Sequence, residues 1–97
     1  MNKLAVTVKF IGVFRSVSGK AKTTLSFEDT VSLKEALKKI VEQIPKLERA
    51  LIDSELEDPR PNTLILVNGK EISILNGLET IIRDGDEVVF IPVVHGG

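Results

Sequence analysis

One amphipathic helix pattern stands among several strand-like segments, and it limits how this chain can build a core. Ser32 and Glu35 have the spacing of a capping box, which marks a first helical turn, and Pro45 marks the end of the helix. Between them, apolar residues recur at spacings of three and four and form one stripe: Leu33, Ala36, Leu37, Ile40, Val41 and Ile44. Because one helix covers one face of a sheet, the sequence predicts a single main helix packed on a single sheet.

The strand-like segments lie on both sides of this helix. Residues 4–10 alternate apolar and polar side chains, as in a strand with one buried face, whereas residues 64–67 are apolar without interruption. Asn68-Gly69 is a typical hairpin turn, since both residues tolerate positive φ angles. The predicted strands are residues 4–10, 23–27, 64–67, 71–75 and 87–94, with a hairpin connection over 12–22 and a short helical turn within 46–52.

The order of these elements predicts an α+β fold, best matched by a β-grasp roll with a mixed sheet of about five strands packed on one main helix. Such a fold pairs the first and last strands in parallel at the centre of the sheet. The 97 residues, of which 42% are hydrophobic, suffice for one core, so residues 1–97 are predicted to form a single domain with a C-terminal tail over 94–97. The acidic segment 53–62 is expected to be an exposed, mobile loop.

Composition excludes several functions. The 13 Lys and Arg nearly balance the 14 Asp and Glu, so no positive field is present to bind a nucleic acid or an anionic membrane. With no cysteine and one histidine, the chain offers no disulfide, no thiol nucleophile, no zinc site and no Ser-His-Asp triad. Residues 4–14 are too short and too polar for a signal peptide or membrane span, so a cytoplasmic location is expected.

A second apolar surface follows from two strands whose side chains are apolar on both faces, residues 64–67 and 88–91. We expect the helix-facing set to be Leu64, Leu66, Val88 and Phe90. The outward, partner-binding set is then predicted to be Ile65, Val67, Val89 and Ile91. Alternatively, the acidic loop covers these residues, or they are ordinary scattered surface hydrophobes. The pattern alone does not decide between these interpretations.

The end of the sequence, Val94-His95-Gly96-Gly97, is its other distinctive feature. Glycines lack a Cβ, so Gly96 and Gly97 could pass through a slot too narrow for side chains and present a carboxylate to a partner. An extended tail from Val94 onward reaches about 13 Å, which is enough to enter a cleft. Glycines at a chain end also simply fray, so this feature is a weak signal by itself.

Several segments together resemble the ubiquitin-like sulfur carriers, most closely the small subunit of molybdopterin synthase. The resemblance rests on Leu66-Val67-Asn68-Gly69-Lys70, Asp84-Gly85-Asp86-Glu87-Val88, Phe90-Ile91-Pro92 and the terminal Gly96-Gly97, with Val8-Lys9-Phe10, Arg15 and Gly19 near the start. It covers nearly the whole chain. The departures are the acidic insertion 53–62 and Val93, where a second proline is frequent in the family.

The resemblance implies a co-substrate without catalytic residues of its own. A ubiquitin-activating-like enzyme would use ATP to adenylate the carboxylate of Gly97, and a sulfur donor would convert it to a thiocarboxylate. The sulfur would then pass to a pterin precursor in the large subunit of molybdopterin synthase, with Gly96 in the slot. Val93, Val94 and His95 would contact that partner, His95 at the tunnel mouth. The chain itself is expected to bind no cofactor and no metal.

Other functions stay open on the sequence. A ubiquitin-like modifier would be conjugated to lysines of target proteins through Gly97, and other carriers supply sulfur for thiazole synthesis or transfer-RNA thiolation. From a different class, the chain could be a non-catalytic β-grasp interaction module in which the two glycines are accidental.

Overall fold

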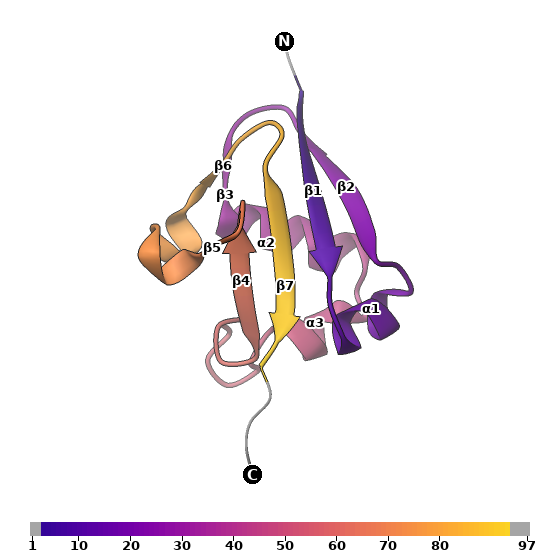
Figure 1. Cartoon of the computed structure of the whole chain (residues 1–97). Coiled ribbons are helices and arrows are strands. Elements are labelled where there is room, and N and C mark those ends of the chain that lie inside the picture. Colours follow the sequence, from indigo (N-terminus) through magenta and orange to yellow (C-terminus); the bar gives the residue numbers. More distant parts are fainter. Residues whose placement is uncertain (1–2, 94–97) are drawn as a thin grey trace.

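Two apolar strands form the centre of the sheet in a computed structural model, which describes residues 3–93. Strand β1 (Leu4–Phe10) runs parallel to β7 (Glu87–Pro92), with Val8 opposite Val88 and Phe10 opposite Phe90. The sheet has the order β2-β1-β7-β4-β5, and its other strands pair antiparallel (Figure 1): β2 (Lys22–Phe27), β4 (Thr63–Val67) and β5 (Lys70–Glu71). The predicted α+β β-grasp fold with its parallel central pair is therefore confirmed.

Helix α2 (Leu33–Gln43) crosses behind this sheet (Figure 1). The Ser32 hydroxyl accepts a hydrogen bond from the Glu35 amide at 3.2 Å, so the predicted helix start is confirmed. The helix buries Leu33, Ala36, Leu37 and Ile40. They meet the sheet in one core, to which it contributes Val6, Val8, Phe10, Leu25, Ile65, Val67, Val88 and Phe90. At its centre the rings of Phe10 and Phe90 stack with centroids 6.2 Å apart.

Short elements complete the fold, and two of them depart from the sequence prediction. Residues 12–22 contain helix α1 (Val13–Ser18), which buries Phe14 and closes the end of the core, in place of a simple hairpin connection. The strand predicted over 71–75 is only two residues long, because the Glu71 side chain accepts the Ser73 amide and starts a 3₁₀ turn, η1 (Ile72–Ile74). The remaining elements are α3 (Leu47–Leu51), η2 (Gly77–Glu79) and a two-stranded sheet of β3 (Val31–Ser32) with β6 (Ile81–Ile82).

The predicted facing of β4 is wrong. Ile65 and Val67 are buried, with exposures of 1% and 5%, whereas Leu64 is 37% exposed. The cause is the register with β7: Ile65 lies opposite Phe90 and Val67 opposite Val88, and residues opposite each other in a sheet share a face.

Asn68 holds this register from the turn after β4. Its side chain bonds to Asp86 and to the amide of Glu87, both at 2.9 Å, and its own amide donates to the carbonyl of Glu87 at 2.8 Å. The predicted Asn68-Gly69 turn is confirmed, since both residues have positive φ, 51° and 82°.

The acidic loop 53–62 is only partly exposed. Its residues 54–57 are exposed, but Pro59 is buried, and the Asp53 amide donates to the Asp58 carbonyl at 2.9 Å. Glu57 and Pro59 face the helix side of the molecule, where they lie beside α2 and α3. Arg60 of the loop lines a hollow with Leu64 and Val93, so the loop borders the outward side of β4 and β7 at one end and does not cover it as one interpretation of the sequence required.

Candidate functional site: an apolar patch and the base of the tail

The outward side of β4 and β7 carries a continuous apolar surface, which we call the outward patch. Leu64 lies opposite Ile91 and Leu66 opposite Val89, so their side chains alternate with those of the core. Val89 and Ile91 are partly exposed as predicted, and Val93 is 40% exposed at the end of β7. The outward patch comprises Leu64, Leu66, Val89, Ile91 and Val93.

Two of the predicted partner-binding residues are not part of this surface. Ile65 and Val67 belong to the core, and Leu64 and Leu66 take their places on the outward patch. An uninterrupted apolar strand gives no alternation from which to choose a face, so no signal within residues 64–67 could have found them. Their facing is set by the register with β7. The other predicted site residues, Val94, His95, Gly96 and Gly97, lie outside the described residues.

Pro92 and Val93 form the base of the tail, at the end of the sheet beside α1 and the loop before β4 (Figure 1). Pro92 lies opposite Thr63, the first residue of β4, so Val93 extends one residue past the strand pairing. The Val93 amide donates to the carbonyl of Asn62 at 3.0 Å. On the side of β1, the amide of Ile11 donates to the carbonyl of Phe90 at 3.1 Å, which brings the loop before α1 against β7.

The outward patch carries no charge of its own, and the ion pairs found in residues 3–93 lie at its margins. Lys9 pairs with Glu87 at 3.0 Å near the start of β7. Near the other end, Arg60 pairs with Asp58 in a two-point contact, at 2.9 Å from Nε to Oδ1 and 2.5 Å from Nη2 to Oδ2. The hydrogen bond from the Arg60 guanidinium lowers the pKa of the Asp58 carboxyl below its ordinary value.

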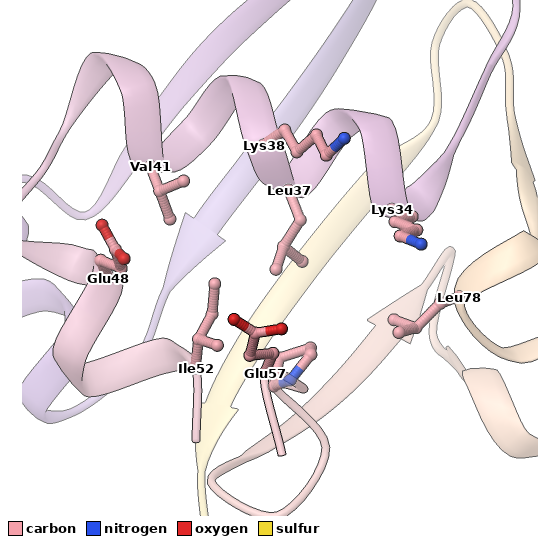
Figure 2. A pocket seen from close by; sticks show the side chains of 9 residues that line it. Lys34, Leu37, Lys38, Val41, Glu48, Ile52, Glu57 and Leu78 are labelled. Atoms are coloured by element: carbon pink, nitrogen blue, oxygen red, sulfur yellow. The ribbon is translucent and has the colours of Figure 1, made fainter. Parts of the chain in front are cut away.

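A separate hollow of about 250 Å³ lies on the helix side, between α2, α3 and the acidic loop. Leu37, Val41, Ile52 and Leu78 give it apolar walls, and Figure 2 shows Lys34 and Lys38 projecting from α2 on one side with Glu48 and Glu57 on the other. Neither the outward patch nor the base of the tail contributes to it. The hollow is therefore distinct from the candidate site.

The described residues contain no group of three or more His, Asp or Glu side chains that could hold a metal ion. No helix among them is long and apolar enough to cross a membrane. What the site offers is a contact surface and the base of a tail.

A small mixed sheet wrapped on one helix, with an apolar outer face next to the end of its last strand, defines a ubiquitin-like β-grasp protein. Comparison with known proteins agrees: the model of the ThiS family matches residues 8–97. The chain belongs to the ThiS family, and so to the ubiquitin-like sulfur carriers.

The individual proteins that this chain is similar to include archaeal and eukaryotic proteins named as modifiers. Small archaeal modifier protein 3 of Haloferax volcanii is 28% identical over 94 residues, which cover 97% of this chain and 100% of the relative. The solution structure of small archaeal modifier protein 1 from Methanosarcina acetivorans is 28% identical, with a TM-score of 0.83 over 100% of both chains. The ubiquitin-related modifier 1 homolog 1 of Arabidopsis thaliana is 47% identical over 38 residues, 39% of this chain and 38% of the relative.

Proposed function

We propose that the chain carries sulfur as a thiocarboxylate on Gly97 and donates it in molybdopterin biosynthesis. The observation that carries the proposal is the extent of the family match, which runs through residue 97 and so includes the Gly96-Gly97 pair. The base of the tail supports it: β7 brings Pro92 and Val93 to the end of the sheet, next to the outward patch. An enzyme that contacts the patch would have the tail beside it.

The chemistry needs an activating partner. A carboxylate is ionised at neutral pH and is a poor electrophile, so sulfur cannot replace its oxygen directly. An ATP-dependent, ubiquitin-activating-like enzyme would join the Gly97 carboxylate to AMP and release pyrophosphate. A sulfur donor would then displace AMP and leave the thiocarboxylate. ATP belongs to that enzyme, and this chain acts as its substrate.

The acceptor proposed for the sulfur is a pterin precursor held by the large subunit of molybdopterin synthase. This step is supported by the resemblance of residues 84–88, 90–92 and 96–97 to the small synthase subunit. In that complex the outward patch would contact the large subunit, and Gly96 would occupy the narrow part of its tunnel.

A second candidate is a protein modifier, and the relatives favour it. Two of them bear the name of small archaeal modifier proteins and align over nearly the whole chain. A modifier would share the adenylation of Gly97 but would end as an isopeptide with a lysine of another protein. The two functions therefore differ in the acceptor and not in the activation.

Mass spectrometry of the protein from its native cells tests both functions. A chain that ends at Gly97 and has gained the mass of one sulfur in exchange for one oxygen supports the carrier. A Gly-Gly remnant on lysines of other proteins supports the modifier. A chain whose native form continues beyond Gly97 and is never processed there would contradict both.

Function in molybdopterin synthesis requires a further test. The thiocarboxylated chain, mixed with the large synthase subunit and the pterin precursor, should yield molybdopterin in proportion to the sulfur consumed. A G96V variant should fold normally and fail in this assay, because a branched side chain would not enter a narrow slot. Full activity of G96V would show that the slot is wider than proposed.

A further inference from the structure

The two residues at the base of the tail are held from two sides. Pro92 is the last β7 residue, and the β4–β7 register places Val93 opposite Asn62, one residue outside both strands. The Val93 amide nevertheless donates to the carbonyl of Asn62 at 3.0 Å. The acceptor is the last residue of the acidic loop 53–62. This loop has no role in the proposed sulfur chemistry itself.

The loop is built so that the Asn62 carbonyl is fixed. The Asn62 amide donates to the carbonyl of Pro59 at 3.0 Å, and Pro59 itself is buried. Directly before Pro59, the Asp58 carboxylate accepts hydrogen bonds from the amide of Arg60, at 2.8 Å, and from its guanidinium. Directly after Asn62, the buried hydroxyl of Thr63 donates to the Leu51 carbonyl at 3.1 Å, which ties the start of β4 to α3.

Gly12 approaches the base of the tail from the opposite side. It has a φ of +59°, and a Cβ at this position would lie 3.0 Å from Cγ of Pro92. Only glycine allows this backbone conformation and this close approach together. Its carbonyl accepts the amides of Arg15 and Ser16, so the contact with Pro92 is anchored in the first turn of α1.

We propose that the acidic loop and Gly12 are positioning elements, which hold Pro92 and Val93 in one orientation and so direct the tail toward the activating enzyme. This inference rests on the proposed function of Gly97. When the base of the tail is held in one orientation, a larger fraction of the chains is ready to bind the activating enzyme. The apparent affinity of that enzyme for the chain rises with this fraction. A loosened base would therefore raise the apparent KM of the activating enzyme for this chain and leave kcat nearly unchanged.

Two substitutions of Val93 isolate the hydrogen bond. V93P and V93A both remove the isopropyl group, and only V93P also removes the N–H donor. The proline ring fixes φ and so by itself orders the backbone, which means that a higher KM of V93P reports the lost hydrogen bond. We expect V93P to have an apparent KM about two- to tenfold above that of V93A, as the loss of one hydrogen bond implies. Pyrophosphate exchange by the activating enzyme at varied carrier concentration gives KM and kcat separately. Equal KM values in two folded variants would overturn the proposal.

A second pair of variants tests the loop without touching the tail. D58N removes the charge that holds Arg60, and E87Q removes the charge of the other ion pair, at the opposite end of β7. Hydrogen exchange of the Val93 amide should be slow in the wild type and in E87Q and faster in D58N. Rapid exchange in the wild type would overturn the proposal. If the activating enzyme does not adenylate the wild type, the proposed function fails, while this exchange measurement still decides whether the loop holds the base of the tail.

Discussion

The two faces of the sheet are made of the same residue types but differ in burial. On the core face, Ile65 and Phe90 are 1% and 0% exposed. On the outward face, their sequence neighbours Leu64 and Ile91 remain in contact with water. The difference arises because α2 packs on one face, while no element within residues 3–93 packs on the other.

Burial therefore distinguishes apolar side chains that stabilise the fold from apolar side chains that are available to a partner. Hydrophobicity alone does not distinguish them. An apolar side chain removed from water stabilises the fold by roughly 25 cal/mol per Å² of buried area. A partly exposed one contributes less to folding and keeps its remaining area for a partner. Neighbouring residues on β4 or β7 should accordingly respond to substitution in opposite ways, and the following predictions test this contrast from its largest effect to its smallest.

The largest effect is expected at Phe90. F90A removes a fully buried ring that stacks on Phe10, so we expect a loss of about 3–5 kcal/mol in the free energy of unfolding. I91A, on the next residue, should cost only about 1 kcal/mol or less, because its side chain is already partly solvated. Urea denaturation of both variants measures the difference. Equal losses would mean that the two faces are not energetically distinct.

The same contrast on β4 tests the facing that sequence analysis predicted incorrectly. I65A should destabilise the fold by about 2–5 kcal/mol, whereas L64A should cost about 1 kcal/mol or less. Thermal melts of the two variants under identical conditions suffice. If L64A proved the more destabilising, Leu64 would be the core residue and the register with β7 would be shifted by one.

The sequence was most informative where the pattern was periodic. Residues 4–10 alternate, and β1 has those bounds with Val6, Val8 and Phe10 in the core. The capping box at Ser32 likewise located the start of α2. In both cases one face is polar, so the sequence leaves one possible orientation.

Where both faces are apolar, the orientation depends on contacts distant in sequence. The facing of β4 is set by its register with β7, which the Asn68 side chain fixes through Asp86 and Glu87. That bonding joins residues about twenty positions apart, so no local pattern reveals it. The close approach of Gly12 to Pro92 is similarly non-local, although the glycine itself was visible in the sequence.

An intermediate effect, on binding, is expected at the outward patch. I91D should leave the protein folded but weaken its complex with the activating enzyme by about tenfold or more, because the carboxylate would lose water without gaining a partner. T24D is the matched control, since it adds the same charge to an exposed residue of β2. Titration calorimetry measures both affinities, and thermal melts confirm folding. Equal weakening by T24D would show that net charge, and not the patch, governs binding.

The smallest effect distinguishes apolar burial from charge. The stability difference between the wild type and F90A should not change with pH, since no ionisable group is involved. Asp58 differs, because hydrogen bonding to Arg60 holds its pKa below the ordinary value of 3.8. A group with a lowered folded-state pKa stabilises the fold above its unfolded-state pKa and loses this contribution as the pH falls through the folded-state value.

We therefore expect D58N to be less stable than the wild type by a few tenths of a kcal/mol to about 1 kcal/mol at pH 7, as is usual for an ion pair at the protein surface, here with Arg60 exposed and Asp58 partly covered. The difference should be constant down to about pH 5 and should shrink below pH 3.8 as Asp58 becomes protonated. Urea denaturation at pH 7, 5 and 3 measures it. A difference that is unchanged at pH 3 would mean that the substitution acts through the shape of the loop and not through the charge of Asp58.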